Sequence, residues 1–224
     1  MTKEGGLDMR IVKVSKKSDL FKKAVDIFKE SSYGKSVVNV AFSGGKTPKE
    51  FFKRLSKEDI DWSKINIFLV DERFVPLNSQ DSNYNLLKKN LLDKIEIPEK
   101  NIHRIEMLKT PLDSKIDYEK KLIKYFKGNI KFDLVYLGIG DDGHTASIFD
   151  MDDVNVEDPT LITESSKYPH KRITLSMDTI NKAEKKIIMA TKEKLKVLDD
   201  LVLFKYPAFF VEDPIILIEN EPAI

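Results

Sequence analysis

The chain of 224 residues contains no cysteine. This absence excludes disulfide frameworks, cysteine nucleophiles and thiolate metal sites, and it fits a reducing compartment. Long apolar runs are lacking too, since the longest, such as residues 215–218, are far shorter than the roughly 20 residues that span a bilayer. The first ten residues are polar, so we expect no secretory signal, a tail over residues 1–8 and a cytoplasmic protein.

A large net charge is also missing, because 38 basic side chains face 37 acidic ones and leave a formal charge of +1. No overall basic field attracts nucleic acid or an anionic membrane, so we expect neither as a partner. No repeat and no linker rich in proline or glycine divides the chain. With 41% hydrophobic residues the chain can bury a sizeable core, and we expect one domain over residues 9–224.

Apolar, strand-like runs alternate with helix-like runs. Strands are expected at residues 11–14, 37–42, 65–70, 132–137, 172–176, 186–190 and 215–218, and helices at 18–30, from Thr47-Pro48 onward, at 82–92, 118–126 and 191–203. Strands that are apolar throughout and separated by helices predict an α/β domain with a mostly parallel sheet covered on both faces. Residues 150–170 are acidic and polar, and we expect a surface loop there.

Polar clusters follow three of these strands, at residues 43–47, 71–73 and 138–144. In open parallel sheets, ligands bind outside the carboxyl ends of the strands. The three clusters are therefore expected to meet in one crevice, although they are far apart in sequence.

The first cluster, Ser43-Gly44-Gly45-Lys46-Thr47, joins a strand to a helix. Glycines there free backbone N–H groups, and a helix N-terminus adds positive partial charge, so the segment suits a phosphate. It is not a Walker A loop, because Val40 stands where that motif requires glycine. A tight turn without a ligand remains the alternative.

The third cluster contains Gly138-Ile139-Gly140-Asp141-Asp142-Gly143 and then His144. Its glycine spacing, with Glu164 downstream, imitates a dinucleotide fingerprint, but the acidic residues that follow cannot sustain the required helix and would repel a pyrophosphate. We expect His144 to accept a proton and Asp142 to orient it. A histidine that merely bonds a turn is the alternative.

Three cations are candidate anion ligands: Arg73, Arg172 and Lys194. Arg73 is favoured because it follows a strand end, and for each of them a solvated surface charge is the alternative. The acidic stretch 150–158 has no regular calcium-loop spacing, so no metal site is expected.

Four segments in this order, VAFSGGKTPKEFF, FLVDERFVPLNSQDSNY, FDLVYLGIGDDGHTASIF and RITLSMDTIN, resemble the 6-phosphogluconolactonase family. The resemblance spans about residues 11–210. It implies a single Rossmann-like domain of three layers. It also implies hydrolysis of 6-phospho-D-glucono-1,5-lactone to 6-phosphogluconate, the second step of the oxidative pentose phosphate pathway, without metal or organic cofactor.

The resemblance also implies roles for individual residues. The catalytic histidine corresponds to His144, and the sugar-phosphate ligands correspond to Ser43, Gly44, Gly45, Thr47, Arg73, Arg172 and Lys194. Asp71 is a further candidate, because the related deaminases use that position for proton transfer, and here it is expected to organise Arg73. Lys46 stands where serine is usual, and Thr191 replaces a glycine.

The related glucosamine-6-phosphate deaminases provide the nearest alternative. Their loop resembles GHIAFNEP, with a catalytic glutamate five residues after the histidine, whereas this chain has Phe149 there. A deaminase-like or isomerase-like enzyme and a non-catalytic sugar-phosphate sensor remain as alternatives. The expected partner is the phosphorylated lactone itself, bound by a monomer or weak homo-oligomer.

Overall fold

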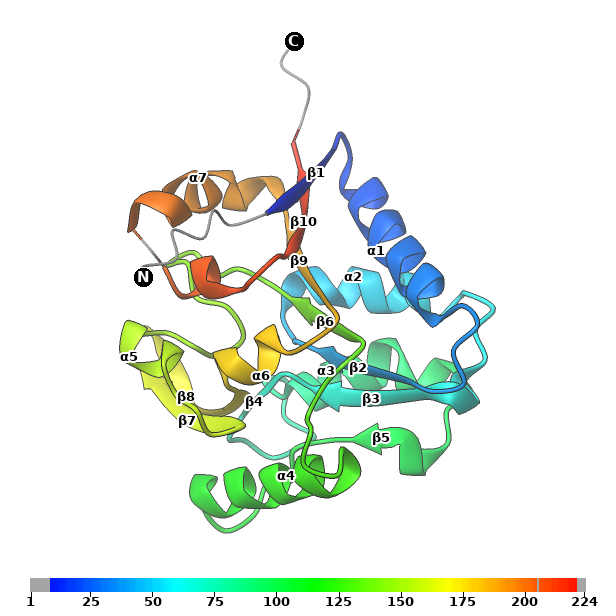
Figure 1. Ribbon diagram of the computed structural model, residues 1–224, viewed down its shortest axis with the longest axis vertical. Coiled ribbons are helices and arrows are strands. Elements are labelled where there is room, and N and C mark those ends of the chain that lie inside the picture. Colours follow the sequence, from blue (N-terminus) through cyan, green and yellow to red (C-terminus); the bar gives the residue numbers. More distant parts are fainter. Residues whose placement is uncertain (1–8, 205, 221–224) are drawn as a thin grey trace.

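A computed structural model describes residues 9–204 and 206–220, so the predicted tail at residues 1–8 lies outside the described part. The main feature is a seven-stranded sheet in the order β1-β10-β9-β6-β2-β3-β5 (Figure 1). Its strands are β1 (Arg10–Val14), β2 (Val38–Phe42), β3 (Ile65–Leu69), β5 (Ile102–His103), β6 (Leu134–Leu137), β9 (Lys185–Ala190) and β10 (Ile215–Glu219). Every neighbouring pair is parallel, as the alternation of apolar strands and helices predicts.

Helices cover both faces of this sheet. They are α1 (Lys17–Ser32), α2 (Lys46–Leu55), α3 (Asn83–Asn90), α4 (Pro111–Tyr125), α5 (Met151–Val154), α6 (Met177–Asn181) and α7 (Leu195–Phe204). Figure 1 shows α1 and α2 on one side of the sheet and α5, α6 and a second, small sheet on the other. The three-layer α/β architecture expected from the sequence is confirmed.

Amphipathic spacing explains how α1 docks. Its apolar residues recur at three- and four-residue intervals, and those that face the sheet are buried: Leu20, Phe21, Ala24, Val25, Ile27 and Phe28. Burial of each large apolar side chain contributes about 1.5–3 kcal/mol. Phe28 also stacks against Phe42 of β2, with ring centroids 6.4 Å apart. The core therefore holds the strand that leads directly into Ser43.

The small sheet was not foreseen. It consists of β4 (Asp71–Arg73), β8 (Tyr168–Leu175) and β7 (Thr160–Ser165) in antiparallel order β4-β8-β7. The prediction of a surface loop at residues 150–170 is therefore wrong. The polar composition of β7 made it resemble a surface loop. Its hydroxyl groups can nevertheless be buried because they form hydrogen bonds: Thr163 Oγ1 donates to the Ser147 carbonyl at 2.5 Å, and Thr160 Oγ1 donates to Glu119 at 3.1 Å.

Several predicted boundaries also change. The segment at residues 172–176 belongs to the small sheet, and residues 71–73 form a strand of their own. Helix α2 begins at Lys46, with Gly45 at its N-cap position, one residue before the expected start at Thr47. Helix α4 begins seven residues earlier than expected, behind a capping box of Thr110 and Asp113. Ser82, at the expected start of the next helix, caps α3, because its hydroxyl accepts from the Asn85 N–H.

A buried carboxylate joins β4 to α3. Glu72 has no exposed surface, and its two oxygens accept four hydrogen bonds of 2.7–2.9 Å, from the N–H groups of Arg73, Asn83 and Tyr84 and from the Ser82 hydroxyl. Burial raises the pKa of Glu72, and the four donors oppose this rise. All four partners donate, so the arrangement is built for the ionised form at the N-terminus of α3.

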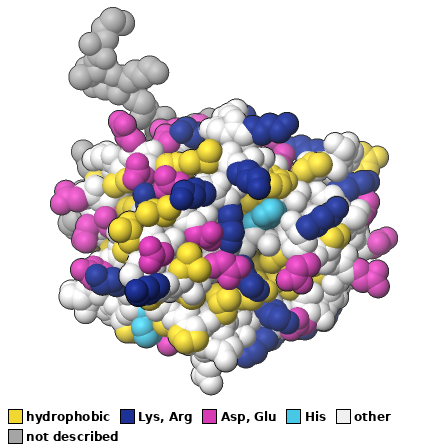
Figure 2. All heavy atoms as spheres, turned by 90° about the horizontal axis from the view of Figure 1, so that it is seen from below, with side chains coloured by type: hydrophobic (Ala, Val, Ile, Leu, Met, Phe, Trp, Pro, Cys, Tyr) yellow, Lys and Arg dark blue, Asp and Glu magenta, His cyan; other side chains and the backbone are white. Residues whose placement is uncertain are grey.

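Surface charge follows the composition. Figure 2 shows acidic and basic side chains interspersed over the face that it presents. Within the described ranges, no helix is both long enough and apolar enough to cross a membrane.

We expect Glu72→Gln to lower the free energy of unfolding by about 3 kcal/mol, because an amide NH₂ replaces one acceptor and leaves buried donors unpaired. Urea denaturation would measure this, with Glu30→Gln as the matched control on an exposed part of α1. Equal denaturation midpoints for the two variants would contradict the structural role of Glu72.

Candidate active site

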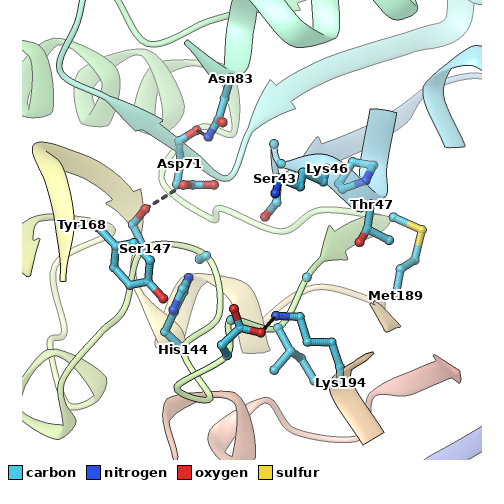
Figure 3. Close-up of a pocket in the computed structure, with 18 of the residues that line it drawn as sticks. Ser43, Lys46, Thr47, Asp71, Asn83, His144, Ser147, Tyr168, Met189 and Lys194 are labelled. Carbon is cyan, nitrogen blue, oxygen red and sulfur yellow. Dashed lines mark hydrogen bonds and ion pairs between the residues drawn. The ribbon is translucent and has the colours of Figure 1, made fainter. Parts of the chain in front are cut away.

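A cavity of about 590 Å³ lies where β2, β6 and β9 end and β4 begins (Figure 3). The residues predicted to bind or react that line it are Ser43, Gly44, Gly45, Thr47, Asp71, Arg73, His144, Arg172 and Lys194. Asp142 does not line the cavity but contacts His144. The three polar clusters therefore meet in one place, because parallel strands end at the same edge of their sheet.

His144 and Asp142 form a close pair. Nδ1 of the imidazole lies 2.5 Å from Asp142 Oδ1, and about one fifth of each side chain is exposed. Burial opposes ionisation of Asp142, but the hydrogen bond and the charge of His144 outweigh it and hold the pKa of Asp142 below its usual range. An ionised carboxylate only accepts, so Nδ1 carries the proton and Nε2 is left as the basic nitrogen.

The glycine loop makes room for this pair. Gly140 N–H donates to the His144 carbonyl at 2.8 Å, which folds the loop back on itself. A Cβ at Gly140 would lie 2.1 Å from His144 Nδ1 and 2.8 Å from Asp142 Oδ1. Position 140 requires glycine because two side chains approach its backbone closely. The glycine spacing therefore does not need a bound dinucleotide as its explanation.

Two arginines lie side by side at one wall of the cavity. Arg73 of β4 and Arg172 of β8 are direct partners in the antiparallel register. Arg73 Nη1 donates to the Asp81 carbonyl at 2.5 Å, and neither guanidinium forms an ion pair with a carboxylate among the described residues. Burial, together with the charge of Arg73, lowers the pKa of Arg172. Two cations held together in this way favour a bound anion.

The 43–47 loop lies against Asn83, whose side-chain amide donates to the Asp71 carbonyl at 2.9 Å. A Cβ at Gly44 would lie 1.9 Å from Asn83 Oδ1, so the loop touches the first turn of α3. Three buried polar atoms around the cavity have no hydrogen-bond partner among the described residues: Ser43 Oγ, Asn83 Oδ1 and Arg172 Nη1. Buried polar atoms are normally paired, so a polar ligand between the loop and the arginines would satisfy them.

Two further carboxylates shape the cavity. Asp71 is 5% exposed, and its Oδ2 accepts from Ser147 Oγ at 2.7 Å. The sequence suggested that Asp71 organises Arg73, but among the described residues the two side chains form no hydrogen bond or ion pair. The charge of Asp71 instead acts on Arg172, where it opposes the lowering of the pKa. Lys194 reaches the cavity from the turn before α7 and pairs with Asp141.

Some lining residues were missed from the sequence. Asn83 and Ser147 lie within the DSNY and HTAS segments, so their motifs carried a signal that was not assigned to them. Tyr168 and Lys17 carried none, because they come from a segment expected to be a loop and from the start of α1.

Comparisons with known proteins agree with this geometry. The family model of glucosamine-6-phosphate isomerases/6-phosphogluconolactonase matches residues 15–219. The 6-phosphogluconolactonase of Synechocystis sp. is 34% identical over 184 residues, which is 77% of each chain. That of Thermotoga maritima is 33% identical over 184 residues, 79% of this chain and 80% of the relative.

Solved structures extend the likeness to the fold. The crystal structure of the Thermotoga maritima 6-phosphogluconolactonase matches with a TM-score of 0.87 and 27% identity, over 94% of this chain and 99% of that one. The Trypanosoma brucei 6-phosphogluconolactonase matches with a TM-score of 0.80 and 25% identity, over 96% and 98%.

The arginine pair predicts a measurable affinity for inorganic phosphate. At roughly ten times its dissociation constant, phosphate should raise the Tm by about 4 °C, and Arg172→Gln should remove most of this rise. Thermal unfolding with and without phosphate measures the effect, and Arg10→Gln, on the exposed start of β1, is the control. An undiminished rise in Arg172→Gln would place the anion elsewhere.

Proposed function

The chain belongs to the glucosamine-6-phosphate isomerase/6-phosphogluconolactonase family, and we propose that His144 is the general base of its reaction. The relatives and structural neighbours bear the name 6-phosphogluconolactonase. The chain is accordingly a lactone hydrolase that converts 6-phospho-D-glucono-1,5-lactone to 6-phosphogluconate in the pentose phosphate pathway. The observation that carries the proposed base is the His144–Asp142 pair at the cavity wall.

The deaminase alternative lacks an acid at the required place. Phe149 occupies the position of the deaminase glutamate, and its ring centroid lies 4.9 Å from that of His144. A phenyl group cannot shuttle the proton that ring opening and isomerisation require. Lactone hydrolysis needs only one base and stabilisation of a developing oxyanion. A silent sugar-phosphate sensor would have no use for an oriented imidazole and carboxylate pair.

The proposed proton path starts at water. As the water oxygen forms its bond to C1 of the lactone, Nε2 of His144 takes one water proton, and the carbonyl electrons move to the carbonyl oxygen. Loop N–H groups or a basic side chain stabilise that oxyanion. The intermediate then collapses, the bond from C1 to the ring oxygen breaks, and the imidazolium returns its proton to the departing ring oxygen. Asp142 remains ionised and holds the imidazole in place.

Binding at the far end of the substrate supports this chemistry. We place the phosphate between the 43–47 loop and the pair Arg73 and Arg172, where the unpaired buried atoms lie. Lys194 lies at the same cavity and is a further candidate ligand. Affinity for the remote phosphate then holds C1 beside the base, which converts binding into orientation. Cytoplasmic location and a monomeric or weakly oligomeric state remain predictions from the sequence.

His144→Ala should lower kcat by roughly 10²–10⁴-fold, because water then attacks without a base. Acid release from freshly made 6-phosphogluconolactone, corrected for spontaneous hydrolysis, measures this. Because the pKa of Asp142 is lowered, this carboxylate stays ionised near neutral pH, so its own protonation should not limit activity there. His170→Ala is the control, since His170 is exposed on β8 outside the cavity. Near-wild-type turnover in folded His144→Ala would rule out the base.

Arg73→Gln should raise KM for the phosphorylated lactone about tenfold and leave the slow hydrolysis of unphosphorylated gluconolactone unchanged, because only the phosphate meets this side chain. The same assay with both substrates gives the comparison, with Arg10→Gln as the control outside the cavity. If KM for the phosphorylated substrate stays constant, Arg73 is not a phosphate ligand.

A further inference from the structure

Tyr168 brings an aromatic ring from the small sheet onto the proposed base. It is the first residue of β8, and it lines the cavity beside His144 (Figure 3). Its ring lies edge-on to the imidazole, with centroids 5.1 Å apart and planes at 70°. It also stacks on Phe149, with centroids 5.4 Å apart at 26°. Because Phe149 itself contacts His144, the three rings form a closed cluster.

Tyr168 also lies close to the negative charges of the glycine loop. Burial and the charges of Asp142 and Asp141 raise the pKa of Tyr168, so its hydroxyl keeps its proton at neutral pH. Asp142 itself contacts His144 Nδ1 through Oδ1, and its Oδ2 lies 3.8 Å from Lys167 Nζ. The contact of Tyr168 with the pair is thus that of its ring with the imidazole.

An imidazole held by one hydrogen bond can still turn about its side-chain torsions. The contact with Asp142 fixes the position of Nδ1, but it leaves the tilt of the ring, and therefore the aim of Nε2, to the packing around it. That packing comes from two rings, Phe149 of the same loop and Tyr168 of the small sheet. A misplacement of about 1 Å is enough to slow an oriented reaction severely.

We propose that Tyr168 is a positioning residue, whose ring fixes the tilt of the His144 imidazole. The inference rests on the proposed function of His144 as base. It gives the small sheet a second task, because the strand that carries Arg172 to the phosphate end of the cavity also carries Tyr168 to the reacting end.

Tyr168→Ala removes the ring and the hydroxyl together. We expect kcat to fall roughly tenfold and KM to stay within about twofold, since the lost contact is to the base and not to the phosphate. If Tyr168 had a purely structural role, the variant would lose stability and a smaller fraction of it would be active. Thermal unfolding measures the stability and active-site titration the active fraction, so kcat is compared per active enzyme. A raised KM with unchanged kcat would mean that Tyr168 contacts substrate, and it would overturn the inference.

Tyr168→Phe keeps the ring and removes only the hydroxyl, so it is the conservative variant. Because its ring still packs against the imidazole, we expect kcat to stay within about threefold of wild type, which restores the activity lost in Tyr168→Ala. Should Tyr168→Ala not fold, Tyr168→Leu, which fills the space without an aromatic edge, replaces it in the same assay. A kcat in Tyr168→Phe as low as in the variant without the ring, or a wild-type kcat in that variant, would overturn the inference.

The matched controls are Tyr33→Ala and Tyr33→Phe, since Tyr33 is a 90% exposed tyrosine that follows α1 and does not line the cavity. His144→Ala belongs in the same series. Wild-type kcat in Tyr168→Ala beside an inactive His144→Ala would overturn the role of Tyr168 alone. Wild-type kcat in His144→Ala would overturn the proposed base and this inference with it.

Discussion

The geometry of the site depends on one buried carboxylate. Glu72 uses four donors from β4 and the start of α3, so these two elements cannot move independently. Its neighbours in sequence, Asp71 and Arg73, are thereby directed to the cavity, and Asn83 lies against Gly44 of the 43–47 loop. Complete burial of a carboxylate costs free energy. The burial of Glu72 is tolerated because both of its oxygens accept hydrogen bonds from these donors.

The large sheet could be predicted from the sequence because buried parallel strands are continuous apolar runs, as residues 65–69 show with INIFL. The small sheet could not, since Thr160–Ser165 is polar and gains its place only through tertiary partners such as Ser147 and Glu119. Asp71–Arg73 was expected only as a polar cluster after a strand, for the same reason. Its strand character comes from pairing with β8, which is about a hundred residues away along the chain.

The same distinction applies to the candidate site. His144 and Asp142 are two residues apart, so a local motif carries their relationship, and the glycine at 140 follows from their contact with the backbone. The aromatic contact of Tyr168 depends on the path of the hairpin β7–β8, and no local pattern encodes it. Motifs at strand ends therefore indicate the candidate reacting groups, whereas the residues that pack around them are placed by tertiary structure.

The electrostatics of the cavity support the proposed phosphate site. Arg73 and Arg172 lie in register on neighbouring strands, and the lowered pKa of Arg172 reports burial and the repulsion between the two charges. A dianionic phosphate bound there would relieve that repulsion and pair with buried donors at the same time. In the proposed mechanism, the protein therefore holds binding energy in an arrangement that is unfavourable without its ligand, and it would apply this energy far from C1. The imidazole would then have only a modest chemical task, because an activated ester held in one orientation needs little more than deprotonated water.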